Sequence, residues 1–422
     1  MFRQFKIKYI CGSVLLLLML ALPLFSPFQE YISIPTELRI STSQSSPETS
    51  QVWSQSDETR TAFSSENVDP TTSDVYHEFA GIPLKKTDVR EMKDIHLIPG
   101  GHSVGVQLQT KGVLVVGHHL VNENKEESTS PGEQSDIQVG DILLKGNGKE
   151  LNSMEELSDI VKSSGDQNES VKFKVKRGEE TFEASLTPSL NKQDGQYQIG
   201  LYVRDSAAGI GTMSFYHPES GKYGALGHVI ADMDTRQPIE INEGTIVESN
   251  VTSIEKGNQG VPGEKKAEFS LRDDRIGTIT KNSSFGIFGK LDEDMENEKY
   301  SNGLPVGYSE EVKEGPAKIL TVLEGEKLQE FDVEIVSNMP KDEPVTKGMV
   351  VKVTDPELLE KTGGIVQGMS GSPIIQDGKI IGAVTHVFVN DPTSGYGVHI
   401  EWMLKEAGID IYKKEEKLNK AG

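Results

Sequence analysis

The stretch Gly368-Met369-Ser370-Gly371-Ser372-Pro373 places a serine between two glycines and directly ahead of Ser-Pro. Glycines let the backbone turn sharply, so that the serine hydroxyl points outward and nearby N–H groups converge on one spot. This pattern is typical of a catalytic serine, with the N–H groups of Gly368 and Ser370 as the oxyanion hole. A Gly/Ser/Pro loop in an ordinary β protein is the alternative interpretation.

The residues after this loop favour the catalytic interpretation. Pro373–Gln376 is an apolar strand, Asp377-Gly378 is typical of a type I′ turn, and Lys379–Thr385 is the return strand. The sequence therefore predicts a tight hairpin whose return strand lies beside the substrate.

A serine nucleophile needs a base. His228, in Gly227-His228-Val229, lies upstream of Ser370 at the end of a small, apolar run. A buried core histidine is the alternative. His386 is a rival base that we expect to line the pocket, His399 lies on a later strand, and His118 and His119 fall in another domain.

The acid that orients the base is harder to assign. Asp355 lies between His228 and Ser370, but Asp355-Pro356 is also typical of an N-cap followed by the first residue of a helix. Asp232 and Asp234 are close to His228 in sequence, and Asp205 and Asp391 are weaker candidates. The residues alone leave these alternatives open.

The N-terminus indicates export. Residues 1–8 carry Arg3, Lys6 and Lys8, and residues 9–28 are uncharged and mostly apolar. About 20 residues span a bilayer, and a positive flank stays in the cytoplasm. We predict a signal or membrane anchor over 1–30, followed by a disordered Ser/Thr-rich linker over 31–95 that is open to proteolysis.

Residues 96–190 have the pattern of a PDZ domain of the α+β class. Ser153-Met154-Glu155-Glu156 is a capping box that opens a helix, and Val171–Val175 and Phe182–Leu186 alternate as strands do. In this fold a peptide adds as an extra strand beside one helix. The positions that match the peptide-binding loop and strand are Ser103, Val104, Gly105 and Val106; a spacer without a ligand is the alternative.

Residues 191–422 contain many short strands separated by glycines, which favours a β-barrel. The segment Glu255–Lys266 is polar and is expected to form a surface loop. The predicted fold class is thus mostly β: an N-terminal anchor, a PDZ domain, and a chymotrypsin-like double β-barrel peptidase domain.

Composition excludes several classes of function. With 65 acidic and 43 basic residues the formal charge is −22, which disfavours nucleic acid as a partner. The one cysteine, Cys11, lies in the apolar N-terminal segment, and no His-Glu-x-x-His run is present. We therefore expect no disulfide, no metal and no cofactor.

Together, Gly227-His228, Asp355 and the Gly368–Pro373 loop, behind an anchor and a PDZ domain, resemble the sporulation stage IV protein B family of serine peptidases. The resemblance implies a triad of His228, Asp355 and Ser370. It also implies self-cleavage in the N-terminal region, and release into the space between forespore and mother cell of a spore-forming bacterium.

By the same resemblance, the substrate is a regulatory membrane protein of an intramembrane metalloprotease complex, and its cleavage leads to activation of a mother-cell sigma factor. Two alternatives remain. One is an exported PDZ scaffold with an inactive peptidase domain. The other is a quality-control protease of the high-temperature-requirement type, although those enzymes place the peptidase before the PDZ domain.

Overall fold

The computed structural model describes residues 37–41, 74–79, 82–124, 127–269, 274–295, 297–340 and 343–412. The chain divides into two compact units, one formed by residues 1–95 and 410–422 and the other by residues 96–409. The predicted anchor over 1–30 lies outside the described residues. Among the described helices, none is long and apolar enough to cross a membrane.

The first unit contains a three-stranded sheet in the order β1-β3-β2. Its strands are β1 (Glu37–Ser41), β2 (Asp74–Phe79) and β3 (Ile82–Met92). β1 runs parallel to β3 and β2 runs antiparallel to it. The prediction of a linker without structure over 31–95 is therefore wrong for these strands. The low hydrophobicity of this segment predicts only that it buries few apolar side chains. Strands can still pair there, because the backbone N–H and C=O groups form hydrogen bonds whatever the side chains are.

Six strands of the second unit close into a first barrel. They are β5 (Ser103–His118), β14 (Leu201–His217), β15 (Lys222–Ala225), β16 (Ile241–Glu248), β19 (Arg275–Ser283) and β20 (Gly286–Leu291). Pairings run β5-β16-β19-β20-β15-β14 and return from β14 to β5. β4 (His96–Pro99) and β21 (Leu304–Pro305) extend the sheet beside β14. Alternating buried residues such as Val106, Leu108 and Ile246 fill the barrel.

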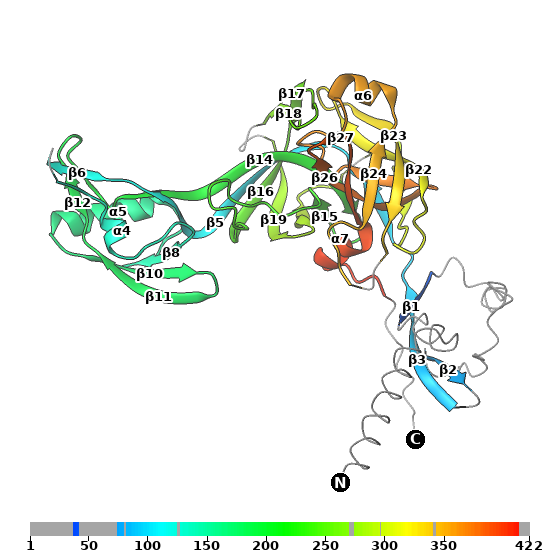
Figure 1. Cartoon of the computed structure of the whole chain (residues 1–422), viewed down its shortest axis with the longest axis horizontal. Helices are drawn as coiled ribbons and strands as arrows, with labels where there is room; N and C mark the ends of the chain where they lie inside the picture. Colours follow the sequence, from blue (N-terminus) through cyan, green and yellow to red (C-terminus); the bar gives the residue numbers. More distant parts are fainter. Residues whose placement is uncertain are drawn as a thin grey trace, which may run out of the picture. The chain divides into compact units, whose positions relative to one another are not determined.

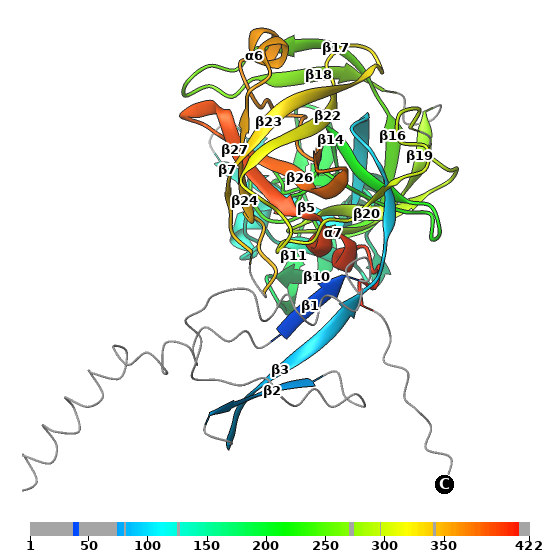
Figure 2. The same ribbon diagram turned by 90° about the vertical axis from the view of Figure 1, so that its right-hand side faces the viewer.

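A second closed barrel has the order β22-β23-β24-β27-β26-β25. Its strands are β22 (Gly315–Val322), β23 (Leu328–Asn338), β24 (Met349–Val353), β25 (Pro373–Gln376), β26 (Lys379–Phe388) and β27 (Asp391–His399). Figure 2 shows β22, β23, β24 and β27 as successive strands of its wall. The β25–β26 hairpin is the predicted one, with Asp377 and Gly378 both at positive φ. α6 (Pro356–Thr362) and α7 (Ile400–Glu406) follow β24 and β27.

The PDZ region lies between the distal halves of β5 and β14. Leu114–His118 of β5 pairs with Leu201–Arg204 of β14, and Val113 and Leu114 pair with β8 (Ile142–Gly146) of the PDZ region, whereas Ser103–Gln109 and Ser206–Thr212 pair within the barrel. Figure 1 shows the two strands running side by side over their length. The PDZ region is thus inserted into a hairpin of the first barrel.

The inserted region has its own core and its own helices. α5 (Met154–Asp166) begins at Ser153, whose hydroxyl accepts from the Glu156 N–H as the capping box predicts. The other elements are β6 (Val121–Asn124), β7 (Glu127–Thr129), α4 (Pro131–Gln134), β8 (Ile142–Gly146), β9 (Lys149–Glu150), β10 (Val171–Arg177), β11 (Glu180–Leu186), β12 (Ser189–Asn191) and β13 (Gln196–Gln198). Leu143, Val161 and Phe173 belong to its buried cluster.

A two-stranded ribbon stands where the sequence predicts a surface loop over 255–266. It consists of β17 (Asn250–Glu255) and β18 (Glu264–Glu268). The polar composition suggested full exposure, but Lys265 on β18 is only 1% exposed. Residues 256–263, between the two strands, form the predicted loop, and the prediction is wrong at Lys265, where one side of the polar strand is packed against the second barrel.

Candidate active site

The Ser370 loop packs against the first barrel through backbone contacts. Thr212 of β14 donates its N–H to the Ser370 carbonyl at 3.0 Å and its hydroxyl to the Gly368 carbonyl at 2.6 Å. Gly371 has φ +98°, and a Cβ there would lie 2.0 Å from the Thr212 carbonyl oxygen. Only glycine permits this approach. The predicted nucleophile therefore sits where the two barrels meet.

The Ser370 hydroxyl donates to the Thr385 carbonyl of β26 at 2.7 Å. It must turn away from this oxygen before it can pass its proton to a base. The backbone N–H groups of Gly368 and Ser370 have no acceptor among the described residues. Two free N–H groups flanking a serine hydroxyl are what an oxyanion hole requires.

His228 lies on a strained turn that contacts the same region. Leu226 and Gly227 both have φ of +70°, and Leu226 holds this conformation without being a glycine. Residues held in such regions cost of order 1–3 kcal/mol and are tolerated where the surroundings fix them. A Cβ at Gly227 would lie 2.9 Å from the Thr385 side chain. The turn that carries His228 thus abuts the residue that holds the Ser370 hydroxyl.

The tautomer of His228 follows from its surroundings. Its Nδ1 lies 2.9 Å from the Val229 carbonyl, and because a carbonyl only accepts, Nδ1 carries the proton. Nε2 is then the basic nitrogen. Burial lowers the pKa of His228 below its ordinary value. The ring is therefore neutral at neutral pH, as a general base must be.

His386, the predicted pocket-lining residue, lies against His228. The two ring centroids are 5.1 Å apart and the planes are inclined by 43°. Burial, with repulsion from His228 and Lys347, lowers the pKa of His386 to about 4. The residue beside the candidate base is thus a neutral imidazole.

The structure does not bring Asp355 to His228. Asp355 is the N-cap of α6: its Oδ1 accepts from the N–H groups of Glu357 and Leu358, and its Oδ2 accepts from Asp332 N–H. This is the alternative that the Asp355-Pro356 sequence left open. Since both oxygens are committed to backbone donors, the structure gives Asp355 a capping role.

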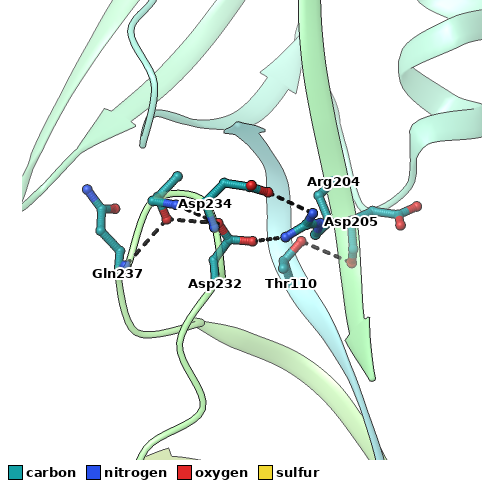
Figure 3. Close-up of polar contacts among 7 residues, drawn as sticks. Thr110, Arg204, Asp205, Asp232, Asp234 and Gln237 are labelled. Carbon is teal, nitrogen blue, oxygen red and sulfur yellow. Dashed lines mark hydrogen bonds and ion pairs between the residues drawn. The ribbon is translucent and has the colours of Figure 1, made fainter. Parts of the chain in front are cut away.

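The other four candidate aspartates also have partners other than His228. Asp232 and Asp234 both pair with Arg204 (Figure 3). Asp205 accepts from Met154 N–H at 2.9 Å, and Asp391 accepts from Thr393 and Ser394. Among the described residues, no carboxylate bonds to His228.

Asn282 of β19 fixes the chain just after His228. Its side-chain carbonyl accepts from Ile230 N–H at 2.9 Å, and its amide donates to the carbonyls of Ile230 and Ile239. Sequence reasoning missed this residue because it is 54 positions beyond His228 and belongs to no motif. A lone asparagine in a strand, where this residue type is depleted, is the only available signal.

Lys265 is a second residue that sequence reasoning missed. Its alkyl chain runs beside Gly368, where a Cβ would lie 3.0 Å from Lys265 Cβ. Its backbone N–H bonds to the Gln367 carbonyl, and its Nζ donates to the buried Thr321 hydroxyl at 2.7 Å. Burial lowers the pKa of Lys265 to about 7. A largely desolvated amine therefore underlies the nucleophile loop.

The remaining histidines lie elsewhere. His399 bonds to Asn338 at the end of β27, and burial lowers its pKa to about 4. His118 and His119 belong to the PDZ region, where His118 Nε2 lies 2.7 Å from the Ile137 carbonyl. Among the described residues no cluster of three or more metal-ligating side chains is found.

The predicted peptide-binding positions of the PDZ domain require a correction. Ser103, Val104, Gly105 and Val106 pair with β14 on one side and, from Val104 on, with β16 on the other, inside the first barrel. All four are buried and cannot accept an added strand. The sequence boundary at residue 96 was misleading because β5 passes through both domains.

An open strand edge lies on β14 instead. Leu201–Arg204 pairs with β5 on one edge, and within the described residues no strand pairs with its other edge. α5 packs against β14 in the same region. Leu201 is buried in the PDZ core, whereas Tyr202 is exposed and stacks on His119. This is the arrangement of an edge strand beside a helix that PDZ domains use.

Comparison with known proteins agrees with these two domains. Residues 195–404 match the family of the SpoIVB peptidase S55, and residues 126–177 match the PDZ domain family.

Three solved structures resemble parts of the chain. The PDZ domain of an SdrC-like protein from Listeria monocytogenes is 22% identical over 22% of this chain and 87% of its own, with a TM-score of 0.18. The active form of the Rv3671c protease from M. tuberculosis is 16% identical over 49% and 78%, with a TM-score of 0.27. The HtrA-type protease AlgW with a decapeptide is 13% identical over 49% and 53%, with a TM-score of 0.29.

These TM-scores are too low to transfer any residue role. The matched families, in contrast, cover both the PDZ region and most of the two barrels. The chain belongs to the SpoIVB peptidase family, and it is a serine endopeptidase that carries a PDZ domain.

Proposed function

We propose that Ser370 is the nucleophile and His228 the general base of this endopeptidase. The Ser370 hydroxyl turns from the Thr385 carbonyl to His228 Nε2, loses its proton there and attacks a peptide carbonyl. The N–H groups of Gly368 and Ser370 donate hydrogen bonds to the developing oxyanion. One such donor lowers the free-energy barrier by roughly 3 kcal/mol. His228 then returns the proton to the leaving amine.

The observation that carries this proposal is that the Ser370 loop and the turn before His228 meet at Thr385. The Ser370 loop bonds to the Thr385 carbonyl, and the turn before His228 packs on the Thr385 side chain. In the turn before His228, Leu226 holds a φ of +70° that costs free energy, which is the expected pattern where geometry serves chemistry.

The orienting group in this proposal is not an aspartate. The Val229 carbonyl fixes the His228 tautomer, and the neutral His386 ring lies beside the imidazolium that forms during proton transfer. Because the His386 ring is neutral, it places no second positive charge beside that imidazolium. The triad of His228, Asp355 and Ser370 implied by resemblance is the competing assignment.

For the biological role, we infer an exported enzyme of sporulation, first anchored in the membrane and then released by self-cleavage in its N-terminal region. Its further substrate would be a regulatory membrane protein of an intramembrane metalloprotease complex, whose cleavage activates a mother-cell sigma factor. Family membership supports this role. The open edge of Leu201–Arg204 would bind an extended peptide of the substrate or of the enzyme itself.

The test uses the full chain and its Ser370→Ala variant. We expect wild-type protein to react with a fluorophosphonate and to shorten from its N-terminal end. The variant should do neither while it keeps the wild-type unfolding temperature. Continued shortening of purified Ser370→Ala protein would exclude Ser370 as the nucleophile.

Fluorophosphonate labelling, together with an assay of casein digestion, separates the other candidate functions. A correctly folded wild-type chain that stays unlabelled would indicate a PDZ scaffold with an inactive peptidase domain. Broad digestion of unfolded casein would indicate a quality-control protease.

A further inference from the structure

The PDZ region contacts the peptidase on the segment that follows the candidate base. This segment, residues 228–240, is called the base loop here. Lys176 of β10 pairs with Glu240 at 2.5 Å, and a Cβ on Gly140 would lie 2.6 Å from the Gln237 side-chain amide. Arg204 reaches Asp232 and Asp234 (Figure 3). Three contacts from separate PDZ elements therefore converge on one loop.

Arg204 stands at the junction of the two domains. It is the last residue of the open PDZ edge, and the pairing of β5 with β14 shifts register immediately after it. The Thr110 hydroxyl holds this bulge by donating to the Asp205 carbonyl at 3.0 Å and the Gly112 carbonyl at 2.5 Å. Bulges of this kind aim side chains. Here the bulge directs the Arg204 guanidinium onto the base loop, as Figure 3 shows.

In the ion pair of Arg204 with Asp232, the carboxylate of Asp232 is the buried member and is held by several hydrogen bonds. Its side chain is 0% exposed, and that of Arg204 is 35% exposed. One oxygen of Asp232 accepts from the N–H groups of Asp234 and Thr235 and from the Thr235 hydroxyl, and the other accepts from Arg204. Burial raises the pKa of Asp232, but hydrogen bonds from Thr235 and the Arg204 charge outweigh burial and leave the pKa below its ordinary value.

The pair is joined to His228 by a short, well-held stretch of chain. Asp232 is four residues beyond His228, and Ile230 between them is fixed by Asn282. The Asp232 N–H bonds to the Gln237 carbonyl, which closes the loop on itself. The chain between His228 and Asp232 is therefore held in one conformation by these bonds.

We propose that Arg204 and Asp232 are positioning residues for the catalytic base, so that the PDZ domain forms part of the scaffold of the active site. This inference rests on the assignment of His228 as the base. Loss of Arg204 leaves a buried carboxylate without its cation, which is strongly destabilising for the site that holds it. The base loop then relaxes, and proton transfer slows while substrate contacts remain.

The chain offers a matched control. Arg177 pairs with Asp141 inside the PDZ region, with side chains 35% and 1% exposed, nearly the same values as for Arg204 and Asp232. Arg177 bonds to both oxygens of Asp141, at 2.7 and 2.8 Å. Among the described residues, neither member of this pair forms a hydrogen bond or ion pair with the base loop. Arg177→Met thus removes a similarly buried ion pair that is not itself bonded to the base loop.

The experiment measures hydrolysis of p-nitrophenyl acetate by the full chain and its variants. We expect Arg204→Met to lower kcat by about tenfold or more, which corresponds to about 1.4 kcal/mol, with KM changed less than twofold. Amide deuterium exchange should accelerate in the base loop alone. Arg177→Met should leave kcat and base-loop exchange at the wild-type level. Arg204→Lys, which keeps the charge, should recover part of kcat.

A second variant guards against a folding defect. Arg204→Met combined with Asp232→Asn removes the unpaired charge, so we expect base-loop exchange to slow again and kcat to rise above that of Arg204→Met. Equal kcat values for Arg204→Met and Arg177→Met would overturn the proposal while leaving Ser370 and His228 in place. Wild-type protein that fails to react with a fluorophosphonate would instead refute the proposed catalytic assignment on which it rests.

Discussion

The nucleophile and the base are held in different ways. The Ser370 loop is fixed by neighbours in its own barrel and by the backbone of β14, with glycines at Gly368 and Gly371 where the chain turns. The base loop also bonds to itself, through the Asp232 N–H and the Gln237 carbonyl, but its attachment to the rest of the molecule is different. It is held by side chains from far along the sequence, namely Asn282 and Arg204.

This difference explains which of the two catalytic segments can be regulated by binding elsewhere in the protein. A loop defined by its own backbone is either formed or unfolded, whereas a loop held by a few distant side chains can shift when those side chains move. The nucleophile side therefore provides fixed geometry, and the base side is where binding elsewhere can change activity.

The largest effect is expected on the nucleophile side, at Lys265. The folded pKa of about 7 lies below the ordinary 10.5, so the unfolded chain binds the extra proton between these values and stability rises with pH. We expect the free energy of unfolding to increase by about 3 kcal/mol from pH 7 to pH 9.5. Lys265→Met should lack this component, as denaturant titrations at several pH values would show. Identical pH dependence in both proteins would contradict the burial of this amine.

On the base side, His386→Ala should lower kcat by roughly 10- to 100-fold, a range typical of a group that assists general acid–base catalysis. Fluorophosphonate labelling rates should fall in parallel, because the same proton transfer is involved. The pKa of His228, read from the acidic limb of the kcat/KM profile, should rise toward its ordinary value, because burial lowers this pKa and the smaller alanine leaves the ring less buried. If kcat and the acidic limb of the kcat/KM profile are both unchanged, His386 only lines the pocket and does not assist the base.

A smaller effect is expected at Asp355, which lies in neither the Ser370 loop nor the base loop. Asp355→Ala removes the N-cap of α6 and should cost about 1 kcal/mol of stability. Activity should fall modestly, because α6 leads into the Ser370 loop. Asparagine caps as well as aspartate does, so Asp355→Asn should restore both stability and turnover. If Asp355→Asn abolishes turnover in a folded protein, Asp355 is the acid of a triad after all.

Local patterns were sufficient for the parts of this molecule that depend on neighbours in sequence. The β25–β26 hairpin, the Ser153 cap of α5 and the Asp355 cap of α6 all follow from short motifs. The His228–His386 contact, the Asn282 anchor and the burial of Lys265 depend on how the strands of two barrels are brought together. No spacing along the chain encodes these contacts, since each joins residues from different strands.

The double passage of β5 and β14 between the domains has a further consequence. A domain joined to its neighbour through one linker can swivel freely, but a domain entered by one strand and left by the next is restrained in torsion. Its beginning and end also lie next to each other at the bulge near Thr110 and Asp205. We therefore expect that the PDZ region can be removed by joining these two residues through a short turn, which would leave β5 and β14 as a simple hairpin of the barrel.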